Sequence, residues 1–319
     1  MTTSPGSRDL TRAPRIGLAL GGGGARGLAH ILMLEVFDEM ELRPQLIAGT
    51  SIGAIFGAAY ASGYTAAQIR AHTEEILKSR LDILRQAFSA RQEPLQRFMN
   101  VFQLRSSIFN AEALLDLIMP PRTAADFASL EIPLKVVASE FSEQKQIVLS
   151  EGPLLQAVAA SMALPGLFTP VEVDGAILLD GGLVNPLPFD VLSDDIDVSV
   201  AINVTGAGRV AGEGTPSAFE AIVTSLQILQ QSIVREKVRA RKPDILIDVE
   251  VGNFHVLEFH KLGKVLEAAA PAKARLRQQL ERVLFAEPAD VTDPAPPPKL
   301  KEPEPAKRAR LAERLLGRR

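Results

Sequence analysis

Serine, glycine and aspartate residues at three points in the sequence could together carry out acyl transfer. The stretch Gly49-Thr-Ser-Ile-Gly53 matches G-x-S-x-G, in which a sharp turn from strand to helix lifts the hydroxyl of Ser51 above the edge of a sheet. Ile52 would then be the first residue of a helix. Its N–H would lie at the helix N-terminus, where partial positive charge suits a developing oxyanion. The pentapeptide alone does not decide the chemistry, because a plain strand-to-helix turn can have the same residues.

A run of glycines forms the second element. From Gly22 to Gly24 no side chain blocks the backbone, so several N–H groups can face one point, which suits an oxyanion hole. The stretch Gly22–Gly27 also matches G-x-G-x-x-G, a dinucleotide-binding pattern that needs an acidic residue at the end of the next strand. Ala48 and Gly49 occupy that place and lead directly into Ser51. The sequence therefore favours acyl transfer and leaves nucleotide binding as the alternative.

The third element is an aspartate followed by two glycines. Asp180 comes directly after an expected strand over residues 176–179, and Gly181 and Gly182 follow it. A carboxylate at a strand end, with no bulky side chain behind it, can be approached closely by another side chain. An aspartate that only opens a turn has the same local pattern. A catalytic role for Asp180 is favoured because the serine motif at Ser51 occurs in the same chain.

Histidines could extend this pair to a triad. His255 and His260 follow the serine and the aspartate in the chain order of an α/β-hydrolase, Ser, Asp, His. Neither lies in a motif, and we treat the triad as the minor hypothesis. His30 and His72 lie in expected helices and are interpreted as structural.

Alternating strands and helices predict a layered α/β domain. Apolar runs and period-two patterns indicate the strands, apolar positions at helical spacing indicate the helices, and Asp174-Gly175 indicates a tight hairpin turn. The expected strands cover residues 15–20, 45–48, 134–138, 146–149, 171–173, 176–179, 198–204 and 245–247. The expected helices cover residues 28–40, a largely helical stretch from 52 to about 118, and 153–162, 218–239 and 262–284.

Composition excludes several classes of protein. The 319 residues are 46% hydrophobic and 23% charged, which is typical of a globular chain with a large core. The absence of cysteine excludes thiol catalysis, disulfides and cysteine metal sites. Residues 1–15 lack the apolar run of a secretory signal. Residues 44–69 have no charge and the length of a membrane helix, but four glycines interrupt them, which favours a buried strand followed by a buried helix.

Charge and proline content predict the domain boundaries. We expect a flexible N-terminus over residues 1–14, one folded body over 15–286, a proline-rich linker over 287–306 and a basic segment over 307–319. The basic segment has six Lys/Arg and one Glu, or +5, so the rest of the −3 chain carries −8. Its leucines fall on one helical face, so contact with an anionic membrane and a solvated tail are both open interpretations.

Taken in order, these motifs resemble the patatin-like phospholipase family. The glycine loop with Arg26, the serine turn and Asp180-Gly-Gly182 follow that family's order, and the stretches Ala160–Pro170 and Asn185–Pro188 are similar to it as well. The resemblance covers roughly residues 14–250, and the chain looks like the compact bacterial members of that family. Residues 193–197 depart from it, because many members have Gly-Ala-Asp there.

The resemblance implies a three-layer α/β/α domain with a central mixed sheet, a nucleophile elbow and a Ser–Asp dyad acting on lipid esters. Ser51 would attack the acyl carbonyl, Asp180 would accept its proton, and the N–H groups of Gly22, Gly23 and Gly24 would hold the oxyanion. Arg26 would steady that loop or meet a phosphate. Gly27, Gly49, Gly53, Gly181 and Gly182 would support these groups.

A carboxylate is a weak base for a serine hydroxyl in water, so this chemistry requires burial that raises its pKa. The implied substrates are phospholipids or lysophospholipids, with no cofactor, metal or nucleic acid, and a cytoplasmic location that includes the membrane periphery. The alternatives are an esterase with a Ser-Asp-His triad and a lipid- or nucleotide-binding protein without turnover. The oligomeric state stays open.

Overall fold

A mixed β-sheet forms the centre of the fold in the computed structural model, which describes residues 14–79, 109–206 and 218–285. Within these ranges the sheet has eight strands in the order β5-β6-β3-β2-β1-β7-β8, with β4 paired to β3 beside this path. From β3 to β8 the neighbours are parallel, whereas β4 and β6 are antiparallel to β3, and β5 is antiparallel to β6. The strands are β1 (Ile16–Leu20), β2 (Leu46–Thr50), β3 (Leu134–Glu140), β4 (Lys145–Leu149), β5 (Val171–Val173), β6 (Ala176–Asp180), β7 (Val198–Asn203) and β8 (Ile245–Asp248).

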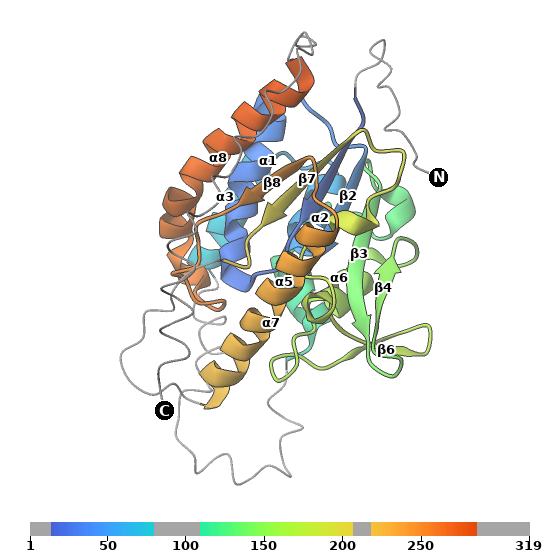
Figure 1. The fold of residues 1–319 in the computed structure, drawn as a ribbon. Helices are drawn as coiled ribbons and strands as arrows, with labels where there is room; N and C mark the ends of the chain where they lie inside the picture. The colour runs from blue at the N-terminus through green and yellow to red at the C-terminus, as the bar shows by residue number, and fades with distance from the viewer. Residues whose placement is uncertain (1–13, 80–108, 207–217, 286–319) are drawn as a thin grey trace, which may run out of the picture. The chain divides into compact units, whose positions relative to one another are not determined.

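Helices cover both faces of the sheet (Figure 1). Successive strand residues point to opposite faces, so Leu18 and Ile47 pack into the main core with α1, α2, α3, α5, α6 and α8. Their neighbours Ala19 and Ala48 face the other way, toward a smaller cluster that includes Val234 of α7. The helices are α1 (His30–Glu39), α2 (Ile52–Ala61), α3 (Ala66–Ser79), α5 (Ala111–Ile118), α6 (Leu154–Met162), α7 (Ala218–Ala240) and α8 (Leu262–Phe285). The predicted three-layer α/β/α arrangement with a mixed sheet is confirmed.

Within the described residues the predicted elements are present, with boundaries that differ by a few residues. The strand expected over 45–48 continues through Gly49 to Thr50, and Asp180 is the last residue of β6 instead of following it. The helix expected from residue 28 begins as a 3₁₀ helix at Gly24–Ala29, because the glycines permit a tighter turn before α1. Asp174 and Gly175 both have positive φ, as a tight hairpin turn requires.

The uncharged stretch 44–69 forms β2, α2 and the start of α3, as a buried strand and helix, so the prediction against a membrane span there is confirmed. Within the described ranges no helix is long and apolar enough to cross a membrane. The segments predicted as linker and basic terminus, residues 287–306 and 307–319, lie outside the described residues, as do residues 80–108 of the expected helical stretch.

Candidate active site

Ser51 lies at a strained turn between β2 and α2. Its φ of 54° and ψ of −122° are unusual for a residue with a side chain. Strand β2 ends at Thr50 and α2 begins at Ile52, so the turn has no spare residue. A Cβ at Gly49 would lie 2.6 Å from the Cα of Ala54, and one at Gly53 would collide with the backbone carbonyl of Leu20. Only glycine fits at these two positions, which explains the G-x-S-x-G pattern in physical terms.

The side chain of Ser51 makes one direct contact with an acid. Its Oγ donates a hydrogen bond of 2.8 Å to Oδ2 of Asp180. The other carboxylate oxygen, Oδ1, accepts the N–H of Gly182 at 2.7 Å. Asp180 is only 4% exposed, and burial raises its pKa to about 6, against the opposing effect of the two hydrogen bonds. The residues therefore provide a buried carboxylate in contact with a serine hydroxyl.

The two glycines after Asp180 are required by close packing. A Cβ at Gly181 would collide with the carbonyl oxygen of Val137 in β3. A Cβ at Gly182 would lie 2.9 Å from Oδ1 of Asp180 and 2.5 Å from the amide nitrogen of Gln230 in α7. Side chains at either position would displace the carboxylate from Ser51.

The glycine loop after β1 lies beside the serine. Gly22, Gly23 and Gly24 line the same cavity as Ser51 and Ile52. The N–H of Gly22 donates to the carbonyl of Pro186 at 2.9 Å, so in this arrangement it is not free for an oxyanion, and the expectation for Gly22 is corrected.

Within the ranges that the structure describes, the N–H groups of Gly23, Gly24 and Ile52 have no hydrogen-bond partner. The close packing of the loop explains its glycines. A Cβ at Gly23 would lie 2.7 Å from the carbonyl oxygen of Val204, and one at Gly24, where φ is +57°, would collide with the backbone of Val256. A side chain at Gly27 would collide with that of Ile52.

Arg26 holds the loop from behind. The side chain is 2% exposed, and its guanidinium donates to the carbonyls of Phe254 at 2.7 Å and Thr205 at 2.5 Å, with longer bonds to Gly252 and to the side chain of Gln227. All four acceptors are neutral, and burial lowers the pKa of Arg26. Of the two roles expected for Arg26, these contacts favour the one of steadying the glycine loop, because the guanidinium already donates its hydrogen bonds to oxygens of the protein.

None of the four histidines, all of which the structure describes, forms a hydrogen bond with Ser51 or Asp180. The Nε2 of His30 donates to the carbonyl of Gly21 at 2.8 Å, and burial lowers the pKa of this ring to about 4. His72 bonds the carbonyl of Ile118 at 2.9 Å, and the backbone N–H of His255 donates to Glu258. Because Asp180 reaches Ser51 directly, the geometry leaves no place for a histidine between them and does not support the triad.

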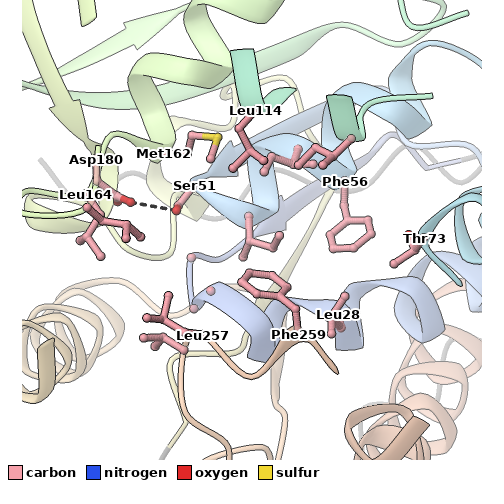
Figure 2. A pocket seen from close by; sticks show the side chains of 18 of the residues that line it. Leu28, Ser51, Phe56, Thr73, Leu114, Met162, Leu164, Asp180, Leu257 and Phe259 are labelled. Atoms are coloured by element: carbon pink, nitrogen blue, oxygen red, sulfur yellow. Dashed lines mark hydrogen bonds between the residues drawn. The ribbon is translucent and has the colours of Figure 1, made fainter. Parts of the chain in front are cut away.

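An apolar cavity of about 180 Å³ leads away from the serine hydroxyl (Figure 2). Its walls come from several helices and from the loop before α8, and they include Leu28, Phe56, Leu114, Met162, Leu257 and Phe259. Further lining side chains come from α2, α3 and α5, and α7 contributes Val223 and Leu226. Within the described residues no group of three or more acidic or histidine side chains could hold a metal ion. The cavity suits a hydrocarbon chain with its polar end at Ser51.

Comparison with known proteins identifies the family. The model of the family described as patatin-like phospholipase matches residues 18–193, which is more than half of the chain. The chain belongs to the patatin-like phospholipase family. The motif order noted in the sequence is therefore that of its family, and the fold is a patatin fold.

Two patatin-like relatives illustrate the extent of the match. An uncharacterized NTE family protein of Mycobacterium tuberculosis is 34% identical over 200 residues, or 61% of this chain and 51% of that protein. Human patatin-like phospholipase domain-containing protein 6 is 33% identical over 178 residues, or 55% of this chain and 12% of that protein. The chain thus spans about half the length of the first relative. Among solved structures, VipD from Legionella pneumophila has a TM-score of 0.44 at 14% identity and covers 83% of this chain and 67% of its own.

The patatin-like block Ala160–Pro170 contains a residue whose contribution the sequence analysis did not recognise. Ser161 is fully buried in α6, accepts the backbone N–H of Ser51 at 2.8 Å and donates to the carbonyl of Val137 at 2.6 Å. It therefore ties the strained turn to β3. A serine among small apolar residues of a buried helix was the signal available, because a buried hydroxyl needs partners.

The block Asn185–Pro188 has a similar role. The hydroxyl of Thr50 donates to the carbonyl of Asn185 at 2.8 Å, next to the Pro186 carbonyl that holds Gly22. This segment thus fixes the residue before Ser51 and the first glycine of the loop together.

Proposed function

We propose that the protein is a serine-dependent lipid acyl hydrolase that cleaves acyl esters of phospholipids or lysophospholipids. The observation that carries the proposal is the 2.8 Å hydrogen bond from the Ser51 hydroxyl to the buried carboxylate of Asp180. Membership of the patatin-like phospholipase family supports the same class of reaction.

In this mechanism Asp180 is the base. As Oγ of Ser51 attacks the acyl carbonyl carbon, its proton passes to Oδ2 of Asp180 and a tetrahedral oxyanion forms. When the carbon–oxygen bond to the lipid alcohol breaks, Asp180 returns the proton to the leaving oxygen, and an acyl-serine ester remains. Water then attacks this ester with Asp180 again as base, and the fatty acid and free serine are released.

The oxyanion must be stabilised by donors that are free to meet it. We propose the N–H groups of Gly23, Gly24 and Ile52, which line the cavity and have no partner within the described residues. The helix N-terminus at Ile52 adds partial positive charge, and the cation of Arg26 lies behind the loop with neutral acceptors only. Such stabilisation is usually the largest part of catalysis in acyl transfer.

The pKa of Asp180 supports its role as base. An aspartate with its ordinary pKa of 3.8 is a weak base for the serine proton. A pKa of about 6 makes the Asp180 carboxylate a stronger base, and the carboxylate is still mostly ionised at neutral pH. Apolar walls around the hydroxyl support an acyl chain as the group bound beside it.

A labelling and turnover experiment tests the proposal. Purified protein should hydrolyse a soluble short-chain p-nitrophenyl ester and react with a fluorophosphonate at Ser51. Ser51→Ala and Asp180→Asn should each abolish turnover, and their combination should be no worse, because residues that act as a unit are not additive. His255→Ala and His260→Ala should leave turnover near that of the wild type. Asp194→Asn, a change at an exposed aspartate, serves as the matched control.

The mechanism is wrong if Ser51→Ala keeps a substantial part of the activity. A loss in either histidine variant as large as that in Asp180→Asn would replace the dyad by a triad.

A further inference from the structure

The outer face of helix α7 is apolar and exposed. Ile222, Ile228 and Leu229 are 57%, 58% and 59% exposed, and with Phe141 they are the large hydrophobic side chains that stand out in solvent among the described residues. Their spacing, together with the exposed Ala221 and Ser225, forms one stripe along the helix. Within residues 221–234 there is no charged residue.

The inner face of the same helix borders the candidate active site. Val223, Leu226, Gln227 and Gln230 line the cavity that contains Ser51. This part of α7 is thus a wall with apolar side chains on both sides. Apolar helix surface of this kind is normally buried in a core or in lipid, and here the described residues leave the outer apolar side chains exposed.

Phe141 lies at the same edge of the sheet. It follows β3, which is parallel to β2, so it lies beyond the carboxyl ends of the strands, as Ser51 does. Phe141 is 62% exposed. The N-terminal half of α7 also extends past the carboxyl ends of the strands (Figure 1), and Gln230 contacts the region of Gly182 there. The exposed apolar groups therefore share the edge that has the serine.

We propose that the outer stripe of α7 (Ala221, Ile222, Ser225, Ile228 and Leu229), with Phe141, inserts into the surface of a lipid bilayer and holds the cavity beside the membrane. This rests on the proposed function, in which the substrate is an acyl ester held in a bilayer.

Two features favour lipid over a protein partner. On α7 the stripe has aliphatic and small side chains without arginine, and Phe141 is the one aromatic side chain of the proposed surface, whereas protein interfaces are enriched in aromatic and arginine anchors. The same helix lines, with its inner face, the cavity proposed for an acyl chain, so binding through the stripe would hold that cavity close to the lipid.

Because the stripe is uncharged, its binding should not depend on salt. Neutral phosphatidylcholine vesicles should bind the wild-type protein equally at low and high ionic strength, unlike an electrostatic contact, which is screened. This separates the stripe from the basic segment 307–319, whose attraction to anionic lipid should fade with salt.

The test uses the full-length protein with Ile222→Gln, Ile228→Gln and Leu229→Gln combined. None of the three side chains lines the cavity, and glutamine is a good helix former. The matched control, Ala270→Gln with Ala274→Gln, places glutamines on the exposed face of α8. Co-sedimentation with phosphatidylcholine vesicles should fall by about tenfold or more in the triple variant, because three aliphatic side chains are lost from the lipid contact. The control should bind like the wild type.

Hydrolysis of a soluble short-chain ester, measured on the same samples, should stay within about twofold of the wild type, since the cavity is unchanged. Equal vesicle binding by triple variant and wild type, with this turnover intact, overturns the membrane surface and leaves the proposed function standing. A wild-type dimer that the triple variant turns into a monomer also overturns it, in favour of a second copy of the chain. A third result would be that the wild type binds vesicles independently of salt and the triple variant does not, while neither protein cleaves an ester. That result supports the proposed membrane surface and refutes the proposed hydrolase function.

Discussion

Replacing Asp180 by asparagine should make the protein more stable at neutral pH while it removes activity. Burial moves the pKa of this carboxyl from its ordinary 3.8 to about 6. Each pKa unit corresponds to about 1.4 kcal/mol, so keeping the group ionised costs the folded state about 3 kcal/mol. Asparagine carries no charge, and its amide can accept the N–H of Gly182 and donate to Oγ of Ser51, so the two local hydrogen bonds persist.

The sign of the pH dependence follows from the raised pKa. The folded state binds the Asp180 proton more tightly than the unfolded state, so the wild type has its full stability from this group below about pH 4 and loses it as pH rises through about 6. Asp180→Asn has no such loss. The free energy of unfolding of the variant relative to the wild type should therefore grow by up to about 3 kcal/mol between pH 4 and pH 8.

Urea unfolding of both proteins at several pH values measures this difference, and comparison of the two cancels the titration of all other groups. Ser51→Ala is the control, because it keeps the buried carboxylate. It removes a hydrogen bond that lowers the pKa of Asp180, so its stability should depend on pH at least as strongly as that of the wild type. A difference between Asp180→Asn and wild type that stays constant from pH 4 to pH 8 would refute the argument that burial raises the pKa of Asp180.

The other predictions concern turnover and membrane binding. The kcat/KM for a soluble ester should fall about tenfold per pH unit below pH 6, because Asp180 must be ionised, and an activity that is flat down to pH 5 would contradict this. Ser161→Ala should lower kcat about tenfold or more with KM nearly unchanged, since it frees the strained turn; a change in KM alone would assign Ser161 to substrate binding. Gly24→Ala should lower turnover about a hundredfold through a displaced oxyanion donor, whereas Gly152→Ala, also at positive φ but in open space, should not. Deleting residues 307–319 should weaken binding to anionic vesicles at low salt only, as sedimentation would show.

Local patterns in the sequence were sufficient for the secondary structure around the site. The glycines at 49 and 53 predicted a tight turn around Ser51, and Asp174-Gly175 predicted a hairpin that ends in Asp180. These predictions succeed because turn geometry and strand alternation depend on neighbours along the chain. The order of the motifs was also sufficient for the family, which the family match confirms.

Contacts between distant segments could be seen only in the folded chain. Ser51 and Asp180 are 129 positions apart, and their 2.8 Å contact depends on β3 lying between β2 and β6. The same folding takes the N–H of Gly22 away from the site and gives it to Pro186, a pairing that no local pattern indicates.

The sequence by itself thus determined which residue types stand at the ends of the strands. The tertiary structure alone decided which of their polar groups meet, which are already used, and how deeply Asp180 is buried. The physical reason is that a hydrogen bond or a pKa shift depends on distance and solvent exclusion, and both are set by how the sheet and its helices pack.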